Sequence, residues 1–184
     1  MTTSLEERVR RLEDRAAIQE LGVLYGFVMD ERDEPGIRQI FCADATLRSE
    51  DGVFAANGLE EIVTTYLGRF AQLGPTNHFS HGHVVRLDES DPDRATGLLS
   101  SHAEVVRDDV PMQVALRYKD VYRRVDGRWR FADRLMGYMY YLPISDLSTA
   151  LGDRNSVRAY HDHRPADWPE KLYSEGPGLL KNYL

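Results

Sequence analysis

The first thirty residues place apolar side chains at intervals of three and four, a spacing that collects them on one face of an α-helix. Ser4 precedes two glutamates, so it is expected to cap the helix while the acids favour its positive end. Pro35 and Gly36 are helix breakers. We therefore predict one long amphipathic helix that ends near Asp30. Its apolar stripe consists of Leu5, Val9, Leu12, Ala16, Leu21, Leu24, Tyr25 and Val28.

The next segment combines short elements with a second amphipathic helix. A short helix is expected at residues 37–41, and short strands at 45–49 and 52–55 are expected to form a hairpin. Residues 58–73 again have the apolar period of a helix. The inner side of this second helix consists of Ile62, Val63, Tyr66, Leu67 and Phe70.

After Pro75 the apolar period changes from that of a helix to that of a strand. Four long strands are predicted, and they cover residues 78–87, 95–107, 112–125 and 128–142. Asp126-Gly127, between the last two, is the strongest short hairpin signal in the chain. Helices followed by a meander of antiparallel strands indicate an α+β domain over residues 1–142. We expect a curved, mostly antiparallel sheet wrapped around the N-terminal helices.

The last segment, residues 143–184, is rich in Pro, Gly, Asp and Tyr and only weakly periodic. It is too apolar in places to be a free linker. We expect it to form a C-terminal extension that covers the pocket mouth or a subunit interface. The side chains expected to become buried there are Trp168, Leu172, Tyr173, Leu179 and Leu180.

Composition excludes several classes of protein. With 184 residues, the chain suits one domain with a sizeable core. A net charge of −7 argues against nucleic-acid binding, because no basic face is available for phosphates. The single cysteine, Cys42, cannot form an internal disulfide. The N-terminus is charged where a signal peptide would be apolar, and no apolar run is long enough for a membrane span. A cytoplasmic protein is expected.

Two ionisable residues stand at unusual places. Asp30 closes an otherwise apolar helix, and His78 opens an apolar strand. Burying either alone is costly, whereas an aspartate–histidine pair can be buried together and supplies a general base. Two alternatives remain open. Asp30 could lie in solvent beside its charged neighbours, and His78 could be a strand histidine bonded to the backbone.

Other residues near these two allow more than one interpretation. Tyr25 is either part of the core or the donor to a substrate oxyanion, with Tyr138 or His102 as substitutes. His102 enters the pocket only if its strand face is the concave one. His81 and His83 could bind a metal with a distant third ligand, but strict strand alternation places His78 on the opposite face, so we predict no metal site.

Three stretches of the chain are distinctive: Arg15-Ala-Ala-Ile-Gln-Glu-Leu21 with Tyr25 and Asp30, Thr76-x-His78, and Tyr122-Arg-Arg-Val-Asp-Gly-Arg-Trp129-Arg-Phe131. These motifs and the order of elements resemble the SnoaL-like branch of the nuclear-transport-factor-like superfamily. The enzymes closest in pattern are scytalone dehydratase, hexachlorocyclohexane dehydrochlorinase and bile-acid 7α-dehydratase. The resemblance covers residues 5 to 142. In the bile-acid enzyme, an arginine on the last strand falls at Tyr138 of this chain, with Arg134 nearby.

The resemblance implies a cone-shaped domain and a cofactor-free lyase or isomerase of the dehydratase type. Its substrate would be a small hydrophobic cyclic, polyketide-like or steroid-like molecule, and the assembly a homo-oligomer, a trimer or else a dimer. Asp30 and His78 would be catalytic, with Tyr25. The alternatives are a polyketide cyclase, an epoxide hydrolase, or a non-catalytic binding protein such as a dioxygenase small subunit. Substrate-binding residues would be His102, Tyr118, Tyr138, Phe27 and Tyr66.

Overall fold

The computed structural model describes residues 4–168 and 178–184. Three α-helices precede or interrupt the early strands, and four long strands follow. The helices are α1 (Leu5–Asp30), α2 (Glu34–Ile40) and α3 (Leu59–Phe70). The strands are β1 (Phe41–Ser49), β2 (Ala55–Asn57), β3 (Leu73–Leu87), β4 (Arg94–Arg107), β5 (Val110–Val125) and β6 (Arg128–Pro143). Short 3-10 helices, η1 (Ile144–Thr149) and η3 (Leu179–Asn182), lie in the C-terminal extension.

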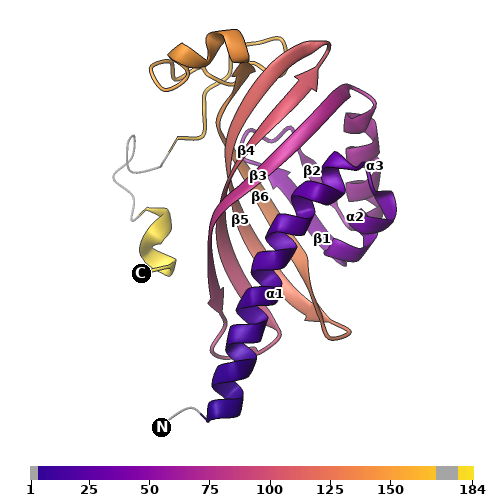
Figure 1. Ribbon diagram of the computed structural model, residues 1–184, viewed down its shortest axis with the longest axis vertical. Coiled ribbons are helices and arrows are strands. Elements are labelled where there is room, and N and C mark those ends of the chain that lie inside the picture. Colours follow the sequence, from indigo (N-terminus) through magenta and orange to yellow (C-terminus); the bar gives the residue numbers. More distant parts are fainter. Residues whose placement is uncertain (1–3, 169–177) are drawn as a thin grey trace.

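The six strands form one sheet in the order β2-β1-β6-β5-β4-β3. All neighbours are antiparallel except β1 and β6, which are parallel. The long strands curve, α1 lies across them, and α2 and α3 group beside its C-terminal end (Figure 1). The predicted α+β class is confirmed. Asp126 and Gly127 have φ angles of 52° and 75°, which identifies the predicted turn between β5 and β6.

Several predicted boundaries differ from the structure: α2 begins at Glu34, β1 at Phe41 and β2 at Ala55. The second amphipathic helix was expected to run to Leu73, but α3 ends at Phe70 and β3 already begins at Leu73. Pro75 therefore lies inside a strand. Proline is tolerated there because β3 is an edge strand of the sheet, where a backbone N–H can be absent without removing a ladder bond.

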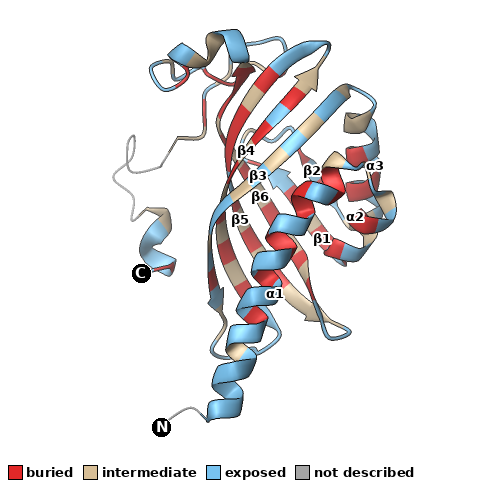
Figure 2. Ribbon diagram, viewed as in Figure 1, coloured by how far each residue is buried: buried red, intermediate tan, exposed pale blue. Residues whose placement is uncertain are grey.

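Helix α1 follows the sequence prediction at its cap and along its C-terminal half, where Leu24 is the exception because it is 45% exposed. Ser4 accepts a hydrogen bond from the backbone N–H of Glu7 at 3.1 Å. At 26 residues the helix is about 39 Å long, and its first turns extend beyond the sheet (Figure 2). Leu5 is 73% exposed and Leu12 67% exposed, so this part of the predicted inner stripe is wrong. The buried apolar positions begin at Ile18.

Two glycines let α1 approach β3 closely. A Cβ on Gly26 would lie 3.0 Å from Cβ of His78, and a Cβ on Gly22 would lie 3.0 Å from the ring of His83. Any larger side chain would therefore push the helix away from the strand. This close approach brings Asp30, at the end of α1, to the start of β3.

The C-terminal extension packs along β6 where β1 no longer does. The last residue of β6 that pairs with β1 is Met136. Beyond it, Asp167 donates its backbone N–H to the carbonyl of Tyr138 at 2.7 Å, and Tyr141 donates to the carbonyl of Ser156 at 3.0 Å. The extension thus occupies the free edge that β1 leaves.

The side chains expected to become buried in the extension behave differently from one another. Trp168 is half-buried, and its Nε1–H donates to the carbonyl of Met139 at 3.0 Å. Leu179 is half-buried, but Leu180 is 54% exposed, so the expectation is wrong for Leu180, which lies at the turn of a short surface helix. Leu172 and Tyr173 lie outside the described residues.

Candidate active site

Asp30 and His78 are in direct contact. Nδ1 of His78 lies 2.6 Å from Oδ1 of Asp30, and the backbone N–H of His78 donates to Oδ2 of the same carboxylate at 2.8 Å. Thr76 donates its hydroxyl to Oδ1 at 2.7 Å. The predicted contact is confirmed, and the carboxylate is held by three hydrogen bonds from one short stretch of β3. Asp30 is thus neither a solvated helix residue nor a free acid.

The electrostatics of this contact favour an ionised aspartate. The side chains of His78 and Asp30 are only 17% and 16% exposed. Burial raises the pKa of Asp30, but the hydrogen bonds from the His78 ring and backbone outweigh it, and the pKa lies below its ordinary value. With Nδ1–H directed at the carboxylate, Nε2 of His78 is the ring nitrogen left to accept a proton.

A cavity of about 60 Å³ lies beside the histidine. His78 lines it, together with carbon-rich side chains from α1, α3 and the inner faces of β4, β5 and β6. Four of the tyrosines singled out from the sequence line the cavity: Tyr25, Tyr66, Tyr118 and Tyr138. The cavity is about two water molecules in volume, so a ring-bearing substrate requires it to widen.

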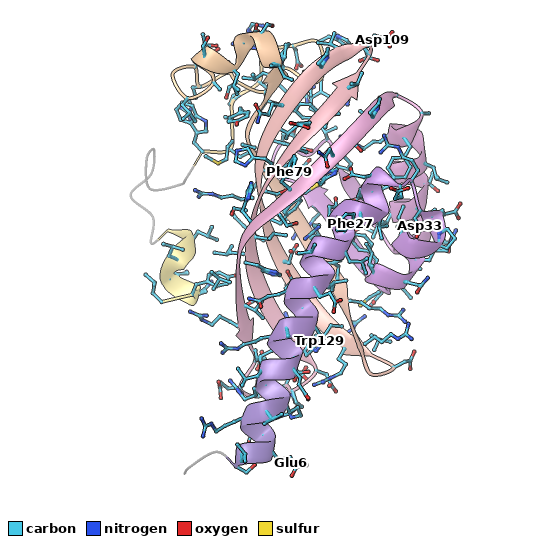
Figure 3. The ribbon with its side chains drawn as sticks, viewed as in Figure 1. Glu6, Phe27, Asp33, Phe79, Asp109 and Trp129 are labelled. Carbon is cyan, nitrogen blue, oxygen red and sulfur yellow. The ribbon has the colours of Figure 1, made fainter. Side chains whose placement is uncertain are left out.

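Phe27 and His102 were expected to contact substrate, and the structure contradicts both. Phe27, labelled on α1 in Figure 3, is 64% exposed and does not line the cavity. His102 lies on the outer face of β4, where Nδ1 is 2.8 Å from Nε2 of His81. The inner face of β4 carries its odd-numbered residues, such as Ala103 and Val105, and these line the cavity.

A β-bulge in β3 decides where the other histidines point. Ser80 pairs with Ser101 and His83 with Leu99, so two residues of β3 lie opposite a single residue of β4. The bulge shifts the alternation by one position. His83 therefore faces α1 on the inner side, as His78 does, whereas His81 faces outward. The expectation that His81 and His83 share a face is wrong for this reason. Among the described residues no group of three possible metal ligands occurs.

Tyr25 lies between the cavity and a buried charge. Its hydroxyl is 2.8 Å from the hydroxyl of Tyr66, and the guanidinium carbon of Arg134 lies 4.0 Å from its ring centroid. Arg134 is fully buried and forms two hydrogen bonds with Asp120, at 2.9 and 2.8 Å. Arg134, which was noted from the sequence as lying near Tyr138, is thus buried against the ring of Tyr25 and does not line the cavity.

Three charged residues near the cavity received no role in the sequence analysis. Arg32 and Arg69 line the cavity, and Asp120 holds Arg134. Asp120 could have been found from the sequence, because it continues the alternation of Tyr118 and Tyr122 on the inner face of β5. Arg32 carries no such signal, because it stands in the turn after α1 with a φ of 56°.

Comparison with known proteins agrees with the fold. The family model of the SnoaL-like domain matches residues 10–135. The chain therefore belongs to the SnoaL-like family. No curated protein sequence matches the chain significantly. Within the described residues, no helix is long and apolar enough to cross a membrane.

Solved structures of similar shape include enzymes. A type 2 hexachlorocyclohexane dehydrochlorinase, LinA, is 25% identical with a TM-score of 0.66, over 74% of this chain and 93% of that one. The type 3 LinA of Novosphingobium barchaimii LL02 is 23% identical with a TM-score of 0.65, over 75% and 94%. A candidate scytalone dehydratase of Novosphingobium aromaticivorans is 18% identical with a TM-score of 0.67, over 74% and 91%.

Proposed function

We propose that this protein is a cofactor-independent lyase or isomerase that uses His78 as a general base and Asp30 as the residue that orients it. The observation that carries the proposal is the 2.6 Å contact between the two side chains, next to a cavity lined mainly by apolar groups. A histidine with one nitrogen bound to a carboxylate and the other free is suited to remove a proton from carbon. The dehydrochlorinase relatives support an elimination chemistry.

The proposed reaction begins with removal of a proton from the carbon next to a carbonyl. The proton moves to Nε2 of His78, and the electron pair moves onto the carbonyl oxygen to form an enolate. Collapse of the enolate expels a group from the adjacent carbon. If that group is hydroxide, it takes the proton back from His78 and leaves as water. If no group leaves, return of the proton to another carbon shifts the double bond.

Tyr25 is the proposed donor to the enolate oxygen, because its hydroxyl lies in the buried cavity wall. Tyr66 can donate to Tyr25, which leaves the proton of Tyr25 for the substrate. Tyr25→Phe is therefore expected to lower turnover about a hundredfold, or on the order of 3 kcal/mol in the barrier, with the fold unchanged. Steady-state kinetics and circular dichroism measure the two effects. If the kinetics of Tyr25→Phe are unchanged, Tyr25 is not the donor and has only a structural role.

The experiment that tests the function itself is hydrogen–deuterium exchange at carbon. Cyclic ketones that carry a hydroxyl or halide two carbons from the carbonyl are incubated in D₂O and followed by proton NMR. A base at His78 would exchange the proton next to the carbonyl, and elimination would release the leaving group. A polyketide cyclase or epoxide hydrolase would show no release from these probes, and a binding protein would show neither process.

Assembly stays a prediction. Apolar side chains remain exposed on the outer side of α1 and on β3, which favours a subunit contact. They include Leu5, Val9, Leu24, Phe27, Phe79 and Val84. We expect a homo-oligomer, a trimer first and a dimer next. Sedimentation equilibrium at micromolar concentration measures its size, and a monomer would contradict the expectation.

A further inference from the structure

The end of the cavity formed by α3 and the C-terminal half of β6 differs chemically from the end at His78. Arg69, in the last turn of α3, lines it, together with Tyr138 and Tyr141 of β6. We propose that this end binds a carboxylate of the substrate, so that the substrate class is a small organic acid whose reacting carbonyl lies at the other end. Only the identity of the reacting group, a carbonyl, rests on the proposed function; the carboxylate site does not depend on it.

Arg69 is a cation without an acidic partner. Among the described residues, no carboxylate oxygen lies within 4.0 Å of its guanidinium group. The guanidinium carbon lies 4.3 Å from the ring centroid of Phe54. Burial acts to lower the pKa of Arg69, but the neighbouring phenol groups outweigh it and the pKa is raised. The side chain therefore keeps its charge in a mostly apolar wall, where an anionic ligand would supply the missing partner.

Unused hydrogen-bond donors lie around this guanidinium. The hydroxyl of Tyr141 is buried near the guanidinium of Arg107, and its proton has no acceptor among the described residues. The hydroxyl of Tyr160, in the C-terminal extension, lies close to the guanidinium of Arg69 and can accept from it, so only the phenol's own proton lacks an acceptor. Tyr141 is 2% exposed and lines the cavity. A buried hydroxyl proton without an acceptor is costly, and a carboxylate has two oxygens that can accept from a guanidinium and a phenol together.

The charge balance of the cavity favours the same ligand. Arg32 and Arg69 supply two guanidinium groups, against the single carboxylate of Asp30 bound to His78. The fixed charge is thus positive whichever protonation state His78 has. The chain as a whole carries a net charge of −7. A positive cavity in an acidic protein attracts anions locally, because low-dielectric walls focus its field.

Arg69 is better suited than Arg32 to bind the ligand. Arg32 already donates to the carbonyls of Met29 and Gly74, at 2.9 and 2.6 Å, and to the hydroxyl of Thr76 at 3.0 Å. These hydrogen bonds use the guanidinium donors of Arg32 to stabilise the turn after α1. No hydrogen bond of Arg69 to a carbonyl or carboxylate is present among the described residues.

The test measures equilibrium binding, which needs no turnover. Acetate and benzoate are titrated into the full-length protein, each against its neutral amide, with calorimetry or proton NMR shifts as the readout. We expect the wild type to bind each carboxylate at least about tenfold more tightly than the amide. Arg69→Gln should reduce this preference to less than about twofold, and Arg69→Lys should keep part of it. Tyr141→Phe should weaken carboxylate binding and leave amide binding unchanged.

The matched control is Arg128→Gln, which removes the same charge at the exposed turn between β5 and β6. It should keep the full preference, and thermal melting checks that every variant is folded. Equal binding of acid and amide by the wild type would overturn the proposal. So would an unchanged preference in Arg69→Gln, or no saturable binding of either carboxylate at millimolar concentration. If Arg69→Gln does not fold, a reduced preference in Tyr141→Phe supports the site, and an unchanged preference overturns it.

Failure of this inference and failure of the proposed function give different results. His78→Gln should keep the carboxylate preference, because His78 lines the cavity from β3 whereas Arg69 lines it from α3. If the protein prefers carboxylates but catalyses no exchange at carbon, the anion site is supported and the proposed reaction is refuted. If the protein catalyses exchange at carbon but does not prefer carboxylates, the proposed reaction is supported and the anion site is refuted.

Discussion

His78→Gln and Asp30→Asn are each expected to lower turnover by a factor of about 10² to 10⁴, with the fold retained. Glutamine in place of His78 cannot accept the proton. Asparagine in place of Asp30 keeps a similar shape but loses the charge that stabilises a protonated imidazole, and it can reverse the ring tautomer. Exchange of the substrate carbon proton in D₂O, measured by proton NMR, reports the loss directly.

A histidine on the other face of the same strand provides the control. His81 faces outward and contacts His102, so His81→Gln removes an imidazole near the site without touching the cavity. Its exchange rate should equal that of the wild type. Full activity in His78→Gln would exclude His78 as the base, and equal losses in both variants would point to a general effect on folding.

The largest effect on stability is expected from Asp120→Ala. Asp120 is 2% exposed, and it accepts bonds from Nε and Nη2 of Arg134 and from the hydroxyl of Tyr122 at 2.8 Å. Its removal would leave the guanidinium buried among aromatic rings without a counter-ion. Breaking a buried pair on one side typically costs about 3–5 kcal/mol. Unfolding in urea should therefore show a large fall in the free energy of unfolding with an unchanged m-value.

Removing both members of this pair should cost much less than removing one. In Asp120→Leu combined with Arg134→Met, no uncompensated charge stays in the core, and apolar side chains replace the pair. The surface pair between Arg123 and Asp44 serves as the comparison, because Asp44 is mostly exposed and Asp44→Ala should change stability little. If Asp120→Ala were as mild as Asp44→Ala, the pair would contribute nothing to the stability of the core.

This ion pair also connects stability to the candidate site. The guanidinium of Arg134 lies against the rings of Tyr25, Tyr118 and Phe131, at 4.0 to 4.1 Å from their centroids. Two of these rings line the cavity. A variant that releases Arg134 should therefore alter the cavity wall as well as the free energy of unfolding.

The long helices and strands could be predicted from the sequence because apolar periodicity and turn residues depend only on neighbouring positions in the chain. Apolar period alone located α1, α3 and the four long strands, and the Asp126-Gly127 turn followed from the φ angles that those residues tolerate. The boundary between α3 and β3 could not be located this way. A proline inside a strand is acceptable only at a sheet edge, and the edge is a property of the whole sheet.

The residue pair of the candidate site could also be proposed from the sequence. An aspartate and a histidine at the ends of apolar segments are stable in a core only as partners, and Asp30 and His78 are indeed in contact. The sequence by itself thus determined the fold class and the pair.

Only the tertiary structure decided which side chains join that pair. The bulge in β3 turns His81 outward and His83 inward, and the face of β4 that meets the cavity excludes His102. Phe27 is exposed because the side of α1 that meets β3 is the one that carries Gly22 and Gly26. Arg69 and Tyr141 line the same cavity although they are far apart in the chain. Periodicity defines the faces of each element, but packing between elements determines which face meets which, because one added residue in a strand reverses every side chain beyond it.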